Sequence, residues 1–338
     1  PKGEYTVVFS FIGYKSVVNT LNLNEDKRLD YKLSPDSETL EAVVLTTKKE
    51  NENIISGEIG VEKLKPKDIA TIPVLFGEPD IVKTLTLTPG VKTSGEGSGG
   101  LFVRGGNNSQ NLVLLDEATV YNSNHLLGFF STFNSTAIKD VTLFKGTAPS
   151  QYGGRISSVM DVKMNEGNNQ KFHLGGSIGL ISAKLDMEGP IVKDKGSFLL
   201  AGRTTYVDQF LRFSSDESLN NNRLYFYDFN AKTNYTINEN NRIYLSGYAG
   251  RDFLKIDDSF GLDWGNITGT LRWNHIWNNK LFSNTSLIYS DYDYKVEIAD
   301  QEEDVFSLKS VIGNINLKHD FEYYLNEKNS FAFGLYGQ

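Results

Sequence analysis

The sequence of 338 residues contains no cysteine and no apolar run long enough to form a transmembrane helix. The lack of cysteine excludes disulfide frameworks, CxxC zinc sites and thiol catalysis. Basic residues are also few, 34 against 42 acidic ones, and the net charge of −8 argues against nucleic acid as a partner. The four histidines are scattered, with no Ser-His-Asp order and no paired carboxylates in a pocket motif. We therefore expect no enzyme, no cofactor and no metal centre.

The N-terminal segment shows short alternating strands. Residues 5–33 alternate apolar and polar side chains between turn signals at Gly13 and at residues 24–27. We interpret residues 1–36 as the end of a small β-sandwich. The chain enters this pattern directly from Pro1, without the features of a signal peptide, so we expect it to be part of a longer polypeptide.

A polar linker and a mixed domain follow. Residues 37–56 form the predicted linker, which contains one extended β-branched segment, residues 40–46. Residues 57–168 predict a compact α+β domain. Its expected helices are at 67–72 and 79–87, and its expected strands are at 101–104, 112–115, 141–144 and 159–164. The glycine-rich loop at residues 95–100 is not a phosphate cradle, because the Lys-Ser/Thr pair of a P-loop does not follow it.

Residues 169–338 hold 28 of the 41 aromatic residues and consist of long alternating strands. In residues 224–237, for example, Tyr227 and Phe229 fall on one face, while Asp228 and Asn230 fall on the other. Tight turns alternate with longer polar loops, which is the signature of an outer-membrane β-barrel. A soluble β-sandwich or propeller is the alternative, but soluble strands average only about five to six residues. We count about nine strands, an odd number for a bacterial barrel, and therefore expect further strands beyond Gln338.

Several spaced motifs in residues 103–159 resemble the plug domain of TonB-dependent outer-membrane transporters. They are Val103-Arg104-Gly105-Gly106, residues 111–116, Lys145-Gly146, Tyr152-Gly153-Gly154-Arg155 and residues 157–159. Residues 3–14 look like the end of the carboxypeptidase-regulatory-like domain that often precedes such plugs. Residues 188–190 and 201–206 are similar to the opening barrel strands of the same group. The resemblance covers nearly the whole chain. It implies a membrane all-β barrel of 22 strands with a plugged lumen, of which about the first nine are present.

The resemblance does not extend clearly to SusC-type glycan importers. Those proteins usually carry Lys-Asp-Ala before an Ile-Tyr-Gly-Ser/Ala-Arg motif. In this chain, residues 144–149 are Phe-Lys-Gly-Thr-Ala-Pro, and the later motif is Gln151-Tyr152-Gly153-Gly154-Arg155. A SusD-like surface lipoprotein is therefore doubtful as a partner, and another surface lipoprotein stays open.

The family also suggests a role for the linker strand. An extended segment in a polar linker can add an edge strand to a partner sheet, and residues 40–46 sit where these proteins carry the TonB box. We expect this segment to bind the periplasmic protein TonB, which works with inner-membrane motor proteins. The segment consists of Leu40, Glu41, Ala42, Val43, Val44, Leu45 and Thr46. An ordinary strand of the preceding domain is the alternative.

Similarity to family plugs suggests two further groups of residues. Loops at the plug apices would bind the ligand through polar groups and one aromatic ring, namely Thr93, Ser94, Glu96, Asn107, Asn108, Gln110, Tyr121, Asn122 and His125. Solvated turns are the alternative, and His125 by itself reads as a hydrogen-bonded structural histidine. The plug cations Arg104, Lys145 and Arg155 would form a latch with barrel-wall carboxylates, which would lie in strands outside this chain.

Taken together, the resemblance implies an importer in the bacterial outer membrane, in contact with its lipid, with the N-terminal domain in the periplasm. Proton-motive force delivered by TonB would remodel the plug and admit a siderophore, an oligosaccharide or a peptide. A barrel that serves only as a scaffold subunit of an outer-membrane complex is the alternative function. The identity of the ligand stays open.

Overall fold

The structure is a computed structural model that describes residues 3–9, 17–25, 28, 31–32, 60–65, 78–93, 100–146, 148–213, 217–257, 259–299, 305–326 and 329–338. It divides into two units, Pro1–Gly57 and Glu58–Gln338. In the first unit, β1 (Gly3–Phe9) pairs antiparallel with β2 (Val17–Leu23). The ring of Phe9 packs against that of Tyr31 with centroids 4.1 Å apart.

The second unit begins with a small mixed sheet. Its strand order is β3 (Val61–Leu64), β10 (Ile138–Lys145), β11 (Ser158–Met164), β6 (Asn111–Leu115) and β7 (Ala118–Thr119). Strands β11 and β6 run parallel, and the other neighbours are antiparallel. We call the described residues from 60 to 168 the plug.

Short elements complete the plug. Helix α3 (Ile81–Thr86) starts after Asp80, whose carboxylate accepts a hydrogen bond from the Lys83 amide at 2.9 Å. The remaining short elements are β4 (Val91–Lys92), β5 (Phe102–Val103), η2 (Asn108–Gln110), β8 (Asn124–His125), η3 (Leu126–Gly128) and β9 (Phe130–Ser131). The apolar face of α3 packs with the sheet into one core, in which Leu85, Leu143 and Met160 are fully buried.

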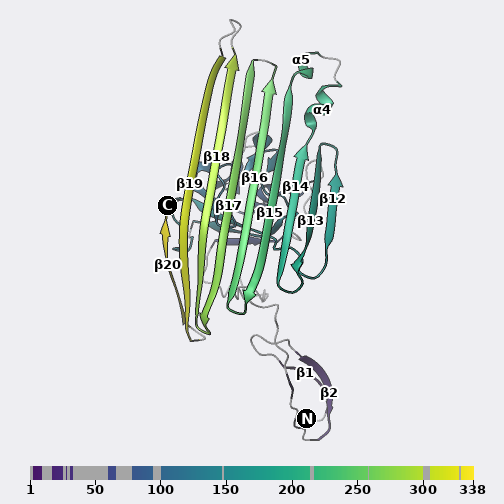
Figure 1. Cartoon of the computed structure of the whole chain (residues 1–338), viewed down its shortest axis with the longest axis vertical. Helices are drawn as coiled ribbons and strands as arrows, with labels where there is room; N and C mark the ends of the chain where they lie inside the picture. Colours follow the sequence, from purple (N-terminus) through teal and green to yellow (C-terminus); the bar gives the residue numbers. More distant parts are fainter. Residues whose placement is uncertain are drawn as a thin grey trace. The chain divides into compact units, whose positions relative to one another are not determined.

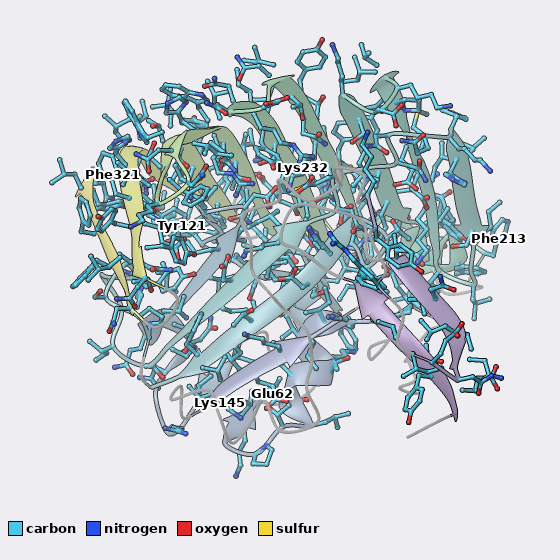
Figure 2. All side chains as sticks on the ribbon, turned by 90° about the horizontal axis from the view of Figure 1, so that it is seen from below. Glu62, Tyr121, Lys145, Phe213, Lys232 and Phe321 are labelled. Carbon is cyan, nitrogen blue, oxygen red and sulfur yellow. The ribbon has the colours of Figure 1, made fainter. Side chains whose placement is uncertain are left out.

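Nine antiparallel strands follow in sequential order, and we call them the wall. They are β12 (His173–Ile178), β13 (Ser182–Val192), β14 (Gly196–Thr205), β15 (Arg223–Asn238), β16 (Asn241–Ile256), β17 (Phe260–Asn278), β18 (Leu281–Ala299), β19 (Val305–Asn326) and β20 (Asn329–Gly337). Two short helices, α4 (Val207–Leu211) and α5 (Glu217–Asn220), lie between β14 and β15. Figure 1 shows the strands side by side with the plug elements behind them, and Figure 2 shows the wall curving around the plug.

The two faces of the wall differ in chemistry. The face toward the plug buries polar side chains, including Arg203, Asp228, Asn230, Lys232, Asn234, Ser246, Asp252, Asn266, Thr268, Thr270, Ser286, Ser290 and Asn316. The other face exposes large apolar side chains, including Tyr227, Phe229, Ile237, Leu245, Ile267, Leu271, Trp277, Leu287, Val311, Ile315 and Leu317. A continuous exposed apolar surface of this kind requires an apolar surrounding.

The fold matches the class predicted from the sequence, a nine-stranded part of a barrel with an α+β plug. The predicted strands at 112–115, 141–144 and 159–164 are present, and the predicted helix at 79–87 is shorter because Asp80 caps it. Strand β3 has no counterpart among the expectations, since four residues carry too short an alternation to be recognised. The helix expected at 67–72 lies outside the described residues. Among the described residues, no helix has the length and apolar character needed to cross a membrane.

Candidate plug–wall interface

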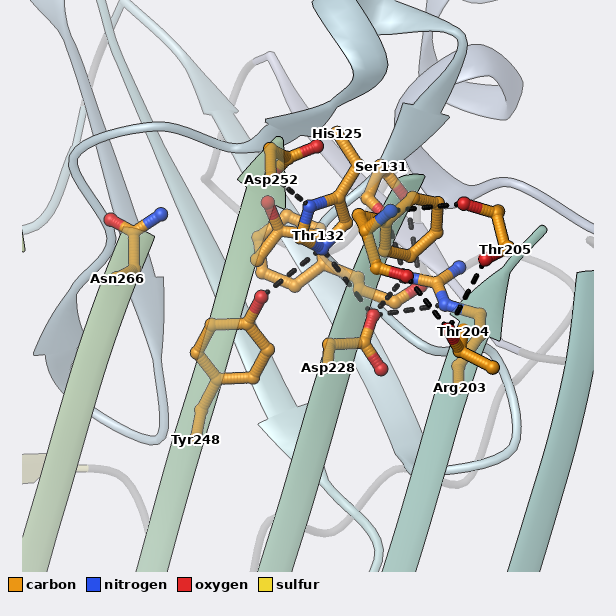
Figure 3. Close-up of polar contacts among 12 residues, drawn as sticks. His125, Ser131, Thr132, Arg203, Thr204, Thr205, Asp228, Tyr248, Asp252 and Asn266 are labelled. Carbon is orange, nitrogen blue, oxygen red and sulfur yellow. Dashed lines mark hydrogen bonds and ion pairs between the residues drawn. The ribbon is translucent and has the colours of Figure 1, made fainter. Parts of the chain in front are cut away.

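A buried arginine of the wall joins the plug to two strands. Arg203 on β14 is 4% exposed. Its guanidinium lies 2.5 Å from the Glu78 carboxylate of the plug and 2.5 Å from the Asp228 carboxylate of β15. It also donates to the Ser131 carbonyl of the plug at 2.8 Å. Figure 3 shows this guanidinium between wall and plug. One side chain therefore pairs with two buried carboxylates that lie on opposite sides of the interface.

His125 extends this network to a third strand. Its Nδ1 lies 2.6 Å from Asp252 on β16, and its Nε2 lies 3.4 Å from Asp228. The Tyr248 hydroxyl is 3.2 Å from the same Nε2, and Figure 3 marks this contact with a dashed line. The imidazole also stacks on Phe226, with centroids 4.1 Å apart. Both ring nitrogens of His125 are therefore in contact with wall residues.

The backbone around His125 is shaped for this contact. Leu126 and Leu127 adopt positive φ angles of 47° and 57°, which are unusual for leucine. The turn aims the Leu126 amide at Asp252, to which it donates at 2.7 Å. On the wall side, Gly250 supplies the space, because a Cβ there would collide with the Tyr248 hydroxyl and lie 3.2 Å from the His125 ring. Two strained residues and one glycine thus permit the close approach.

Charge within this network favours a protonated imidazole. Burial alone would lower the pKa of His125, but Asp252 and Asp228 outweigh it through charge and hydrogen bonding and raise the pKa above its usual 6.5. Arg203 offsets part of the negative charge of Glu78 and Asp228. The protonated ring offers an N–H at both nitrogens and can serve both aspartates.

The raised pKa of His125 predicts a pH-dependent interface. His125 binds its proton more tightly in the folded state than in the unfolded state, and this difference stabilises the folded state. The stabilisation is fully present below about pH 6.5 and is lost as the pH rises through the folded-state pKa. We expect the free energy of unfolding to fall with rising pH by up to about 1.4 kcal/mol per pH unit in that range. Urea titrations at a series of pH values measure it. The slope should flatten in His125→Gln and persist in His173→Gln, since His173 is exposed on β12. An unchanged slope in His125→Gln would contradict the assignment.

A second set of ion pairs joins the β6–β7 hairpin to the wall. Asp116 lies 3.0 Å from Lys232 on β15, and Glu117 lies 3.5 Å from Arg272 on β17. Lys232 is buried and lies between wall and plug in Figure 2. Further along the chain, Glu166 pairs with Arg242 on β16 at 2.8 Å.

Amide contacts form the third part of the interface. The backbone amides of Tyr121 and Asn122 donate to the Asn266 side chain on β17 at 3.2 and 3.3 Å, and Asn266 donates back to the Asn122 carbonyl at 2.9 Å. The Tyr121 hydroxyl accepts a hydrogen bond from Asn314 on β19. Trp264 donates to the Asn124 carbonyl at 3.4 Å. The plug therefore contacts every wall strand from β14 to β17 through polar groups, and β19 as well.

The residues predicted at the plug apices fall into separate places. Thr93, Asn107 and Asn108 are exposed. The backbone amide of Gln110 donates to the Asn107 carbonyl at 2.9 Å, in the turn that follows Asn107. Tyr121 and Asn122 are half-buried against the wall, and His125 is buried there. Ser94 and Glu96 lie outside the described residues. The structure brings Tyr121, Asn122 and His125 to the wall, whereas ligand binding by the group stays a prediction.

The predicted latch cations make their contacts within the plug. Lys145 lies 3.4 Å from Glu62 and donates to the Pro89 carbonyl at 3.2 Å, and Figure 2 shows Lys145 and Glu62 together at the plug side away from Lys232. Arg155 is exposed and donates to the Gly154 carbonyl at 2.7 Å. Arg104 lies beside Gly60 and Gly146. Pairing of these three with strands outside this chain stays a prediction. The predicted TonB-binding residues 40–46 lie outside the described residues.

Sequence reasoning missed the interface residues that the structure reveals. Asp228, Lys232 and Asp252 were placed only on the polar faces of alternating strands, and Arg203 only within the family-like stretch 201–206. A charged residue in the middle of a long strand was the available signal, because a buried charge needs a partner. Within the described part of the chain, no group of three or more His, Asp or Glu side chains is arranged to hold a metal ion.

Comparisons with known proteins support the resemblance. Residues 64–159 match the family model described as the TonB-dependent Receptor Plug Domain. A mutant of the ferric enterobactin receptor PfeA from Pseudomonas aeruginosa is similar in structure, with a TM-score of 0.61 and 12% identity over 84% of this chain and 49% of that one. The hemophore receptor HasR from Serratia marcescens gives a TM-score of 0.62 and 13% identity over 84% and 45%. No curated protein matches the chain.

A third solved structure, the siderophore receptor PirA from Acinetobacter baumannii, gives a TM-score of 0.54 and 16% identity over 79% of this chain and 45% of that one. The chain thus spans about half the length of these receptors. The class defined by fold and interface is a part of a receptor β-barrel with a plug seated against its inner wall. Residues 64–159 thus match the plug domain of the TonB-dependent receptors, and the chain shares the fold of the plug and part of the barrel of such receptors.

Proposed function

We propose that the chain is part of an active importer in which TonB remodels the plug and opens a path along the wall. The observation that carries this proposal is the chemistry of the plug–wall interface. The largest apolar cluster lies within the plug, and among the described residues Tyr248 is its one member from the wall. Two small apolar clusters also cross the interface, one at Phe226 and one at Leu199 and Ala201. Ion pairs and amide contacts join the plug to the wall beside them. Water can replace such contacts, so the plug can leave the wall while its own core stays intact.

The ligand is proposed to bind at the plug apices, and residues 40–46 are proposed to pair with TonB in the periplasm, where the N-terminal domain would lie. The similar structures include receptors for ferric siderophores, a hemophore receptor in complex with heme, and a copper transporter. A metal-bearing cargo is therefore the first class to test, with oligosaccharides and peptides as comparators.

Energised uptake tests this function. Cells that carry the intact receptor should accumulate a radioiron-labelled siderophore from a panel, and a protonophore should abolish accumulation while leaving surface binding unchanged. Active transport depends on the proton gradient, whereas binding does not. Cells without the receptor are the control. Stable protein partners together with no gradient-dependent uptake of any panel member would favour the alternative, a scaffold subunit.

A further inference from the structure

The inner wall concentrates positive charge around one aromatic ring. Tyr244 on β16 is buried, and three cationic groups surround it. The guanidinium carbons of Arg272 and Arg242 lie 4.3 and 4.9 Å from the ring centroid, and the Lys232 ammonium lies 6.0 Å away. Tyr244 and Arg272 are direct cross-strand partners in the β16–β17 register. We call Lys232, Arg242, Tyr244 and Arg272 the wall cluster.

Carboxylates from the plug neutralise the wall cluster. In the described part of the chain, the ion pairs of its three cations run to Asp116, Glu166 and Glu117. Lys318, on β19, differs because it pairs with the wall's own Asp320 at 2.7 Å. Three cations around one buried ring repel one another unless anions are present. The wall cluster therefore depends on anions that the wall itself does not supply.

The β6–β7 hairpin is built to deliver carboxylates at a conformational cost. Asp116 and Glu117 form its two-residue turn, and both have positive φ, 45° and 75°. Such turns favour Asn-Gly, since residues with larger side chains are strained there. Glu at the second position therefore points to a function of the side chain other than forming the turn. Its carboxylate faces Arg272.

Unused hydrogen-bond donors remain in the wall cluster. Among the described residues, the Nε atoms of Arg242 and Arg272 are buried and have no hydrogen-bond partner. An arginine can present two parallel N–H groups to a carboxylate or phosphate. The Glu117 carboxylate instead makes one long contact with Arg272, at 3.5 Å. The plug carboxylates thus fill the site without using all of its donors.

We propose that the wall cluster is an anion-binding site for carboxylate or phosphate groups, which Asp116, Glu117 and Glu166 occupy while the plug is seated. When the plug leaves, the site becomes available to an anionic group of the cargo. This second step rests on the proposed import function. The plug carboxylates compete with other anions for the wall cluster. The site is therefore occupied while the plug is seated and becomes accessible only when the plug leaves the wall.

Replacing the hairpin turn with Asn-Gly tests the site. In Asp116→Asn/Glu117→Gly the turn gains its favoured sequence and both charges are removed. The new asparagine side chain can still accept from the Met164 amide, as the Asp116 carboxylate does at 3.1 Å. Glycine also vacates the space of the Glu117 side chain. We expect the melting temperature of the intact receptor in detergent to rise by several degrees, saturably, when potassium acetate replaces potassium chloride at equal ionic strength. The unmodified receptor should show no such rise.

Two further variants make the test specific. Adding Arg272→Met to the Asn-Gly receptor should abolish the response to acetate. Asp263→Asn/Asp293→Asn is the matched control, because it removes two carboxylates from Arg251 on the outer face, where they lie within ion-pair distance. This control should not respond to acetate. Inorganic phosphate, used in place of acetate, should give the same pattern.

Two results would overturn the anion-site proposal. One is a folded Asn-Gly receptor that responds to acetate no more than the Asp263→Asn/Asp293→Asn control, and the other is a response to acetate that survives Arg272→Met. If the Asn-Gly receptor does not fold, Glu117→Gly alone serves, since Asp116 then keeps Lys232 paired. The measurement needs neither TonB nor a proton gradient. A negative result therefore leaves import standing, and loss of gradient-dependent uptake leaves the anion site standing.

Discussion

Replacing Arg203 with methionine is expected to destabilise the seating of the plug by about 3–5 kcal/mol. The substitution keeps the bulk of the side chain but leaves Glu78 and Asp228 without their common cation, and both carboxylates are almost fully buried. An uncompensated buried charge is far more destabilising than the loss of an exposed ion pair. The Ser131 carbonyl loses its donor at the same time.

Trp264 provides the measurement of plug seating, because its indole is buried on the inner face of the wall and donates to the Asn124 carbonyl of the plug. Release of the plug in urea should change its fluorescence, and Trp273→Phe/Trp277→Phe removes two tryptophans that are exposed on the outer face. The Arg203→Met midpoint should fall well below that of the parent protein.

Arg251→Met is the matched control for Arg203→Met. Arg251 also pairs with two aspartates, but on the outer face, where its side chain is 32% exposed. We expect a change of less than about 1 kcal/mol. The triple variant Arg203→Met/Glu78→Gln/Asp228→Asn also replaces the two unpaired carboxylates with neutral amides, and it should recover much of the lost stability. Equal stability of Arg203→Met and Arg251→Met would contradict the role of the buried network.

The wall could be predicted from the sequence because its information is local. Alternation places Asp228 and Asn230 on one face and Tyr227 and Phe229 on the other, and this pattern repeats between recognisable turns. A shift by one residue would exchange the faces of a whole strand, so the register follows from the same pattern. The short strand β3 escaped because its place in the sheet depends on pairing with β10, which lies about 80 residues further along the chain.

The plug–wall interface could not be predicted in the same way. Glu78 and Arg203 are 125 residues apart, and so are no closer in sequence than many pairs of opposite charge that never meet. The sequence motifs drew attention to Arg104, Lys145 and Arg155, which stand beside glycines. The plug carboxylates at the interface pair instead with cations from the wall strands. Backbone strain at Glu117 and Leu127 is likewise invisible in the sequence. These features depend on the assembled fold.

A proline in the proposed TonB-binding segment is expected to abolish import without affecting ligand binding. An added edge strand is held by backbone hydrogen bonds, and proline removes one donor and cannot be accommodated within a ladder. Along a strand at a sheet edge, successive N–H groups point in opposite directions. Only one of Val43→Pro and Val44→Pro therefore removes a donor that faces the partner, and we expect one of the two to reduce gradient-dependent uptake at least tenfold and the other to reduce it less.

Alanine at the same positions supplies the control for the proline variants. Val43→Ala and Val44→Ala keep both backbone donors, so uptake should stay near the parent rate, since affinity in such pairing comes mainly from the main chain. Surface binding of the labelled siderophore should be equal in all four variants, because residues 40–46 are remote in sequence from the proposed plug apices. Full uptake in both proline variants would show that this segment is an ordinary strand or linker, and TonB would then have to engage another part of the receptor.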